Sequence, residues 1–370
     1  MRHKKKKIEL FINSLQSGGA EHQICFLANF LADSGYSVRI ATINDGDSHY
    51  YISPEVRRIS ISKSTDCSWV KMLRSFFHFV SLRVDCLISF CQKNNYIALK
   101  SLSYSLTSPR VIICGERNHM PSPGKYESIL FRKLYRKYAS YVVSNSYSRS
   151  RYLNEHAPFL SNKIYTIINY TELSSYKPTT FIRSSVIKVL VMARVQRQKN
   201  CHRFVEAISE LRKKSNESFI IDWYGSCQFS NASLQAYVAE AINLVGKNHL
   251  NGIFSFHEPV SNVPELISQY DVVCLPSLFE GFSNSVAEGI ASGKPMLVSD
   301  VSDNSIMVKN GENGFLFDPN CSNSIVDAFL KFFSLSDEKI RQMGEKSRQI
   351  AEELFSKEAF VDTYIRLIES

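Results

Sequence analysis

The sequence lacks several features that would assign it to a class directly. Its nine cysteines include no Cys-x-x-Cys pair, so neither a zinc site nor a disulfide framework is indicated, and a reducing cytoplasm suits such scattered thiols. No apolar run approaches the roughly 18 residues needed to span a bilayer. The basic start at residues 1–7 precedes a short apolar stretch interrupted by Glu9 and Asn13, so we expect no cleaved signal peptide. Repeats, low-complexity tracts and a G-x-G-x-x-G fingerprint are also missing, which disfavours a solenoid or a dinucleotide-binding protein.

The composition describes an ordinary globular protein with an excess of positive charge. The length of 370 residues favours two or three domains, and 44% hydrophobic with 21% charged residues is typical of folded soluble chains. A net charge of +9 indicates an anionic partner, either a nucleotide diphosphate, an acidic lipid or nucleic acid. Because Lys and Arg are spread along the chain without a recognition motif, we expect no nucleic acid.

Short β-rich runs alternate with helical patterns along the whole chain, which favours an α/β fold with parallel sheets. The polar, proline-bearing segment 171–185 interrupts this rhythm and is the predicted linker. We therefore predict an N-terminal Rossmann-like domain at 1–170, a C-terminal one at 186–352 and a final helix within 353–370. The predicted strands are 8–13, 38–43, 84–90, 111–114, 141–145, 164–168, 187–193, 219–224, 253–256, 272–275, 296–299 and 315–317.

The most informative segment is 276–295, which contains Glu280 and Glu288 eight positions apart. It reads as a strand end, a tight loop through Gly281, a short helix from about Ser285, and a stop at Gly293. A loop that feeds a helix N-terminus binds anions through its free N–H groups, while carboxylates accept hydrogen bonds from hydroxyls. Phosphate together with a polyol suggests a sugar nucleotide.

A second, cationic cluster follows the strand at 187–193. Arg194 and Lys199 come where that strand meets the next helix, the usual ligand crevice of an open parallel sheet. Arg offers a planar fork to phosphate oxygens and Lys a mobile point charge. Together they could neutralise a departing diphosphate without a metal.

At these residues the chain resembles family 4 of the retaining GT-B glycosyltransferases, in which an Arg-x4-Lys element and a Glu-x7-Glu element face one nucleotide sugar. The resemblance extends from the Ser-Gly-Gly-Ala-Glu segment at 17–21 to the Asn-Gly-Glu-Asn-Gly-Phe-Leu segment at 310–316. Ala193 replaces the usual glycine before the arginine, and Ile306 stands where a glutamate is common. The resemblance implies two Rossmann-like domains that face each other across a cleft, with the donor bound by the C-terminal one. The last helix would cross back to the first domain.

The resemblance also implies site residues. The donor set comprises Gly18, Gly19, Arg194, Lys199, Gly225, Glu280, Gly281, Phe282, Ser283, Asn284 and Glu288. Glu280, Arg194, Lys199 and His119 are the expected catalytic residues, and Glu116, Arg117 and Asn118 the expected acceptor contacts.

Each site has a structural alternative. Ser285-x-x-Glu288 matches a helix capping box, although its place after Glu280 favours a bidentate contact to ribose hydroxyls. Gly18 and Gly19 permit close approach of a diphosphate or an acceptor group, or belong to an ordinary loop. A residue of the segment 116–119 could take the acceptor's proton, or Glu116 and Arg117 could form a loop ion pair.

Two further segments concern a metal and a membrane. Asp45-Gly46-Asp47 looks like a metal-binding Asp-x-Asp site, but a turn explains it better, and we expect no metal or other cofactor. Segment 69–84 has a wide apolar face with basic residues, and 131–138 is basic and aromatic. Both could rest on an anionic membrane; burial of 69–84 between sheet and helix is the alternative.

The expected function is retaining transfer of a hexose or N-acetylhexosamine from a nucleotide diphosphate sugar, taken as UDP-linked, to a polyprenyl-diphosphate-linked saccharide. Such a step belongs to cell-surface polysaccharide assembly at the inner face of the cell membrane. Front-face attack and a two-step displacement remain equally open. The alternatives are a sugar-nucleotide epimerase of the same architecture and a basic nucleic-acid-binding protein.

Overall fold

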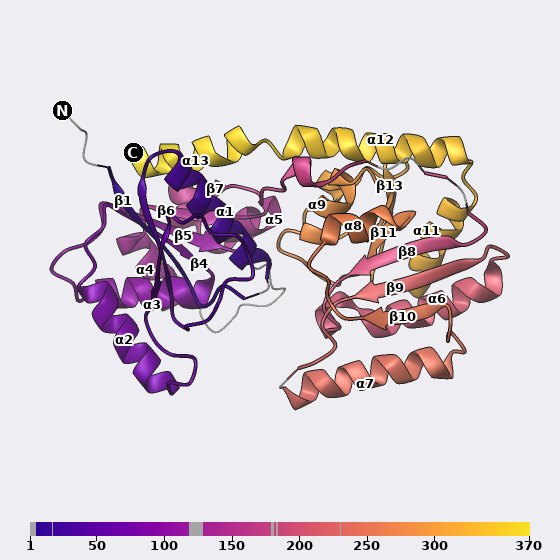
Figure 1. Ribbon diagram of the computed structural model, residues 1–370, viewed down its shortest axis with the longest axis horizontal. Coiled ribbons are helices and arrows are strands. Elements are labelled where there is room, and N and C mark those ends of the chain that lie inside the picture. Colours follow the sequence, from indigo (N-terminus) through magenta and orange to yellow (C-terminus); the bar gives the residue numbers. More distant parts are fainter. Residues whose placement is uncertain (1–4, 17, 118–128, 179–180, 183, 230) are drawn as a thin grey trace. The chain divides into compact units, whose positions relative to one another are not determined.

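The computed structural model describes residues 5–16, 18–117, 129–178, 181–182, 184–229 and 231–370, with the backbone alone at 129–132. The chain divides into two compact units (Figure 1). Unit 1 comprises Met1–Tyr170 together with Lys357–Ser370, and unit 2 comprises Thr171–Ser356.

Unit 1 is built on a seven-stranded parallel sheet of order β3-β2-β1-β4-β5-β6-β7. Its strands are β1 (Lys7–Ile12), β2 (Ser37–Thr42), β3 (Arg57–Ser60), β4 (Cys86–Phe90), β5 (Val111–Glu116), β6 (Tyr141–Ser144) and β7 (Ile164–Thr166). Its helices are α1 (Gly19–Asp33), α2 (Ser68–Val80), α3 (Gln92–Leu102), α4 (Ile129–Tyr138), α5 (Tyr147–His156), the 3₁₀ helix η1 (Pro158–Lys163) and α13 (Lys357–Glu369).

Helices cover both faces of this sheet, so its central strands are apolar almost throughout. On one face, α1 and α13 pack on alternate residues of β1 and β4, such as Leu10 and Ile88. On the other face, residues of α2, α3, α4 and α5 pack on Phe11 and Leu87. This arrangement is the three-layer form expected of parallel strands joined by helical crossovers.

The last helix belongs to unit 1 although its sequence follows unit 2. Tyr364 lies buried on α13, and its hydroxyl accepts a hydrogen bond from Arg117 Nη2 at 2.6 Å. Glu369 accepts hydrogen bonds from Lys6 Nζ at 2.5 Å and from the Tyr36 hydroxyl at 2.8 Å. The chain end is therefore fixed to the first and second strands by polar contacts as well as by packing.

Unit 2 contains a six-stranded parallel sheet of order β10-β9-β8-β11-β12-β13. Its strands are β8 (Ile187–Met192), β9 (Phe219–Tyr224), β10 (Phe254–His257), β11 (Val272–Leu275), β12 (Met296–Ser299) and β13 (Gly314–Phe317). Its helices are η2 (Leu173–Ser175), η3 (Arg197–Lys199), α6 (Cys201–Lys214), α7 (Ala232–Lys247), α8 (Val263–Ser268), α9 (Asn284–Ala291), α10 (Asn304–Met307), α11 (Ser322–Phe333) and α12 (Asp337–Leu354). Both sheets are wholly parallel, which confirms the predicted α/β class.

The segment predicted as a linker, 171–185, begins inside unit 2. Arg348 on α12 explains why: its Nη1 donates to the carbonyls of Leu173 (3.3 Å), Tyr176 (2.8 Å) and Ala291 (2.7 Å). Tyr176 is itself buried. The first residues after the unit boundary are thus held to α9 and α12 by one guanidinium.

Candidate functional site

The chain order of the unit 2 strands reverses between β8 and β11, in the order 3-2-1-4-5-6 of a Rossmann sheet. Ligands of open parallel sheets bind beyond the carboxyl ends of the strands at such a switch point. Arg194 and Lys199 follow β8, Gly225 follows β9, and Glu280 follows β11. The topology therefore gathers the main predicted donor residues at one edge of one sheet.

Lys199 and Glu280 are in direct contact at this edge. Lys199 Nζ lies 2.5 Å from Glu280 Oε1, and the two side chains are only 15% and 7% exposed. The loops that carry them are joined: the Leu278 N–H donates to the Gln198 carbonyl at 2.8 Å, and Gln198 Nε2 donates to the Phe279 carbonyl at 2.9 Å. The Arg-x4-Lys and Glu-x7-Glu elements thus form one site.

Ser302 holds the Glu280 backbone from the neighbouring strand end. Its hydroxyl accepts a hydrogen bond from the Glu280 N–H at 3.1 Å and donates to the Glu280 carbonyl at 2.5 Å. Ser302 has φ 53°, an uncommon conformation for a residue other than glycine, and such positions cluster at functional sites. This residue could not be predicted from the sequence, because a lone serine after β12 carries no recognisable pattern.

Arg194 is exposed, and no hydrogen bond or ion pair of its guanidinium occurs within the described residues. Its loop passes very close to Gly225: a Cβ added there would lie 1.9 Å from the Ala193 carbonyl oxygen. That oxygen accepts a hydrogen bond from the buried Trp223 indole at 2.6 Å. The glycine therefore lets the ends of β8 and β9 approach closely, next to the exposed Arg194.

Helix α9 begins with Ser283 as its N-cap, and the side chain of that residue does not cap it. Instead, the Ser283 hydroxyl donates to Asn304 Oδ1 at 2.6 Å. Ser285 lies inside the helix and donates to the Met192 carbonyl at 2.7 Å, which ties α9 to β8. The capping-box alternative for Ser285 and Glu288 is therefore wrong, because Ser285 is not the capping residue.

Glu288 lies half-buried on α9. Burial raises the pKa of its carboxyl to about 7. Within the described residues, the Glu288 carboxylate has no hydrogen bond or ion pair. Burial, with a smaller contribution from the Glu288 charge, raises the pKa of Tyr176. A ligand that donates hydrogen bonds stabilises a half-buried carboxylate that has no such partner in the protein.

The remaining predicted residues of this loop are placed differently. Gly281 is half-buried. Phe282 is buried, and its ring packs against Phe355 with centroids 6.2 Å apart. The predicted donor contact of Phe282 is therefore limited to its backbone, because its side chain serves the core of unit 2.

In unit 1, the Gly18–Gly19 turn opens α1. The Gly18 N–H donates to the Tyr50 hydroxyl at 3.0 Å, and that hydroxyl donates to the Gly18 carbonyl at 3.0 Å. The Glu21 carboxylate also lies against Gly18, where a Cβ would meet Glu21 Oε2 at 2.2 Å. A ligand phosphate at Gly18 would have to displace these groups, whereas Gly19 lies at the first turn of the helix.

Glu116 and Arg117, the expected acceptor contacts, are buried and bonded within unit 1. The Glu116 carboxylate accepts hydrogen bonds from Arg149 Nη2 at 2.8 Å, the Tyr135 hydroxyl at 2.6 Å and Gln92 Nε2 at 2.9 Å. Arg117 lies over the Phe90 ring at 3.6 Å and donates to Asn169 and Tyr364.

Both predicted acceptor contacts are corrected to structural roles, since both side chains are buried and engaged with other groups of unit 1. The alternative Glu116–Arg117 ion pair is also wrong, because Arg149 takes that place. Asn118 and His119 lie outside the described residues.

Asp45 accepts a hydrogen bond from the Ser64 N–H at 2.6 Å, which lowers the pKa of its carboxyl. This contact supports the turn interpretation of Asp45-Gly46-Asp47. Across the described ranges, no three His, Cys, Asp or Glu side chains group in a way that could hold a metal ion.

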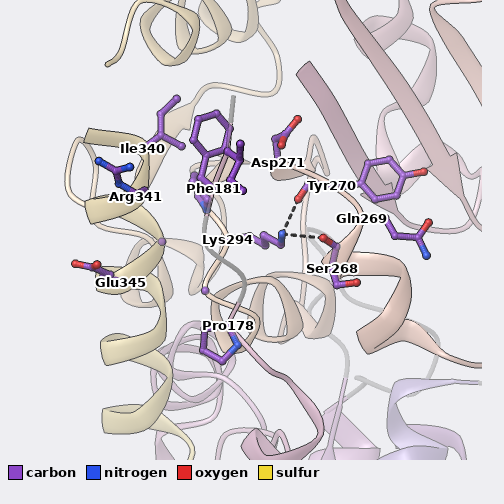
Figure 2. Close-up of a pocket in the computed structure, with 14 residues that line it drawn as sticks. Pro178, Phe181, Ser268, Gln269, Tyr270, Asp271, Lys294, Ile340, Arg341 and Glu345 are labelled. Carbon is purple, nitrogen blue, oxygen red and sulfur yellow. Dashed lines mark hydrogen bonds between the residues drawn. The ribbon is translucent and has the colours of Figure 1, made fainter. Parts of the chain in front are cut away.

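A cavity of about 250 Å³ lies elsewhere in unit 2, at the amino ends of β11 and β12 (Figure 2). The Lys294 ammonium points into it and donates to the carbonyls of Tyr270 (2.6 Å) and Ser268 (3.3 Å), as Figure 2 shows. Burial lowers the pKa of Lys294 to about 8. No predicted site residue lines this cavity, so it is separate from the switch-point site.

Comparison with known proteins gives one family match and several relatives. Residues 175–350 match the family model of glycosyl transferases group 1. The chain is 25% identical over 349 residues to a GalNAc-α-(1→4)-GalNAc-α-(1→3)-diNAcBac-PP-undecaprenol α-1,4-N-acetyl-D-galactosaminyltransferase of Campylobacter jejuni. The match covers 91% of this chain and 90% of that protein. It is 31% identical over 87 residues to an Escherichia coli UDP-Gal:α-D-GlcNAc-diphosphoundecaprenol α-1,3-galactosyltransferase, with 24% and 22% covered.

With several curated relatives, the match spans a third or less of the relative's length. Among solved structures, Anabaena Alr3699/HepE in complex with UDP and glucose superimposes with a TM-score of 0.80 at 16% identity, with 98% of this chain and 99% of that chain covered. The fold is GT-B. The family match and the relatives support a glycosyltransferase. Among the described helices, none has the length and apolarity that a membrane span requires.

Proposed function

We propose that this GT-B protein is a retaining glycosyltransferase that moves a hexose or N-acetylhexosamine from a UDP-sugar to a lipid-linked saccharide. The observation that carries the proposal is the contact between Lys199 and Glu280 beside the open Arg194, at the switch point of unit 2. Cations, a carboxylate and a helix N-terminus gathered at one strand edge suit a nucleotide diphosphate sugar.

Each of these groups has a distinct proposed role toward the donor. Arg194 and Lys199 bind the diphosphate and stabilise the negative charge that grows on it as the bond to the sugar breaks. The start of α9, at Ser283 and Asn284, adds backbone dipoles to the same charge. Glu288 accepts hydrogen bonds from the ribose hydroxyls, and Glu280 orients Lys199 and contacts the sugar.

The reaction breaks the bond between the anomeric carbon and the diphosphate and forms a bond to the acceptor oxygen, whose proton leaves with the diphosphate. A two-step displacement needs a free carboxylate nucleophile at the opposite face of the sugar. Glu280 is already paired with Lys199, which favours front-face attack assisted by the leaving diphosphate. In the alternative in which a protein base takes the acceptor proton, His119 is the proposed residue; no step is assigned to a metal.

The acceptor class is proposed from the relatives. The proteins of Campylobacter jejuni and Escherichia coli are named for undecaprenyl-diphosphate-linked substrates. A polyprenyl-diphosphate saccharide places the enzyme at the cytoplasmic face of the cell membrane, as a peripheral protein of cell-surface polysaccharide assembly. Acceptor recognition is assigned to unit 1, with Asn118 among its contacts.

Two measurements test this proposal. Thermal-shift screening against UDP-, GDP- and ADP-sugars should give the largest increase in melting temperature with a UDP-sugar. Incubation with the labelled donor and a polyprenyl-diphosphate saccharide should then move the label into an organic-extractable product. A free epimer as sole product would identify an epimerase instead, and tight RNA binding that weakens steeply with salt would favour the nucleic-acid alternative.

A further inference from the structure

Helix α2 turns a row of large apolar side chains to solvent. Of its thirteen residues only Ser75 and Phe79 are buried, whereas Trp69, Met72 and Phe77 are 65%, 59% and 60% exposed. Phe79 and Leu82 pack in the core of unit 1, so the burial alternative holds for one side of segment 69–84 and leaves the exposed side unexplained. Isolated exposed apolar residues are normal on protein surfaces, but a row along one helix marks an interaction site.

The exposed apolar surface continues onto the loop after α3. Tyr104 is 60% exposed and Leu106 is fully exposed. The ring of Tyr104 lies 5.8 Å from that of Phe76 on α2, and the Ser105 hydroxyl donates to the Val80 carbonyl at 2.7 Å. Helix and loop thus form one surface, here called the α2 patch, which consists of Trp69, Met72, Leu73, Phe76, Phe77, Tyr104 and Leu106.

A basic hollow of about 440 Å³ adjoins the α2 patch. It is lined by Lys6, Lys7 and Arg83, with the single acidic group of Asp85, and by Thr107 just after the patch loop. Lys6 is paired with Glu369, but the Arg83 guanidinium is exposed and meets only the Leu82 carbonyl within the described residues. Exposed apolar side chains suit contact with the acyl chains of a lipid bilayer, and the adjoining cationic hollow suits its phosphate groups.

The charge of the whole chain is concentrated in the same unit. Unit 1 holds 26 of the 44 Lys and Arg residues and 14 of the 35 Asp and Glu residues, a formal charge of +12, which leaves −3 for unit 2. A second copy of unit 1 on the α2 patch would bring two strongly positive surfaces together, at an electrostatic cost. An anionic bilayer gains from the same charge.

We propose that the α2 patch inserts into the interface of an anionic lipid bilayer while the adjoining basic hollow binds lipid phosphate. Lys100, whose ammonium lies 5.1 Å from the Tyr104 ring centroid, adds a further cation at the rim. This surface is additional to the transferase site and uses none of its residues.

Trp69 provides a built-in reporter. The chain has two tryptophans, and Trp223 is completely buried, so a spectral change on lipid binding belongs to Trp69. With vesicles of phosphatidylcholine and phosphatidylglycerol in equal amounts, emission should shift to the blue and the protein should float with the vesicles. With phosphatidylcholine alone, binding should fall at least ten-fold. The Trp69→Phe variant should still float but lose the shift.

Variants separate the two parts of the surface. Phe77→Ser and Leu106→Ser should each lower the vesicle partition coefficient about ten-fold, since each removes a large apolar side chain. Arg83→Gln should lower it about five-fold, the worth of one cation near an anionic surface, and the loss should shrink at high salt. Ile242→Ser and Lys247→Gln, exposed positions on α7 of unit 2, are the matched controls and should bind normally.

The proposal fails if the patch variants bind anionic vesicles as well as the control variants do. It fails as well if the unmodified protein self-associates without lipid and Phe77→Ser abolishes that association, because a second copy would then cover the patch. The vesicle assay contains neither donor nor acceptor. Its failure would therefore leave the transferase proposal standing, and a failed transferase assay would leave the lipid-binding surface standing.

Discussion

Replacing Lys199 with glutamine tests the proposed role of the cation at the switch point. Two unit charges about 4 Å apart interact with about 4 kcal/mol at an effective dielectric constant of about 20, which corresponds to roughly a thousand-fold in rate. Part of this attraction is already present in the bound donor, so we expect kcat to fall about 10²–10³-fold. Affinity for UDP, measured by calorimetry, should weaken only about ten-fold.

The glutamine side chain can still donate a hydrogen bond to Glu280, so the variant should keep nearly the melting temperature of the unmodified protein. Lys247→Gln, on the exposed last turn of α7, is the matched control for loss of one positive charge. Adding Glu280→Gln to Lys199→Gln should cost less than the sum of the two single changes, since the two side chains are in direct contact and act in part as a pair. A folded Lys199→Gln protein with near-normal turnover would refute the reasoning.

Four further predictions concern pH, packing and metal. Ribose hydroxyls favour the ionised form of Glu288, so UDP-sugar affinity measured by calorimetry should rise from about pH 6 to about pH 8 and then level off; Glu288→Gln should abolish this step. Gly225→Ala should lower the free energy of unfolding by about 1–3 kcal/mol in urea titration, because its methyl group meets Ala193; an unchanged value would contradict that contact. Tyr364→Phe should destabilise unit 1 by about 1–3 kcal/mol, since the buried Arg117 loses an acceptor, and protection of α13 from hydrogen exchange should fall with it. Excess chelator should leave turnover intact, whereas complete loss of turnover would count against catalysis by Arg194 and Lys199 alone.

The strands were predictable where burial on both faces makes the sequence continuously apolar. Strands β9 and β11 have the bounds that their apolar runs indicate. Strand β3 (Arg57–Ser60) was missed, because it is exposed and reads Arg-Arg-Ile-Ser. An edge strand with charged side chains gains its structure from pairing with β2, a long-range contact that no local pattern reveals.

The part of the site that lies on single loops was also predictable from local sequence. A loop after one strand can be recognised from its own residues, and topology then brings such loops together. The Lys199–Glu280 contact follows from this rule, whereas the bracing of Glu280 by Ser302 depends on a single backbone conformation. The roles of Glu116 and Arg117 were misjudged because their partners, Arg149 and Tyr364, are distant in sequence.

The polar side chains at the carboxyl ends of the strands differ between the two parallel sheets. In unit 1, Glu116 is the last residue of β5, next to the strands of the β1/β4 switch point, and its carboxylate is engaged by Arg149, Tyr135 and Gln92. A polar group satisfied in this way rigidifies the edge but offers little to a ligand.

In unit 2, the exposed guanidinium of Arg194 and the half-buried carboxyl of Glu288 have no such partner within the described residues. Desolvated or exposed groups that lack partners gain most from a ligand that supplies the opposite charge or a hydrogen bond. The difference in polar satisfaction, rather than the fold, favours unit 2 over unit 1 for the proposed nucleotide sugar. Unit 1 keeps a rigid sheet edge, and its surplus of positive charge is available for the anionic surface proposed for the α2 patch.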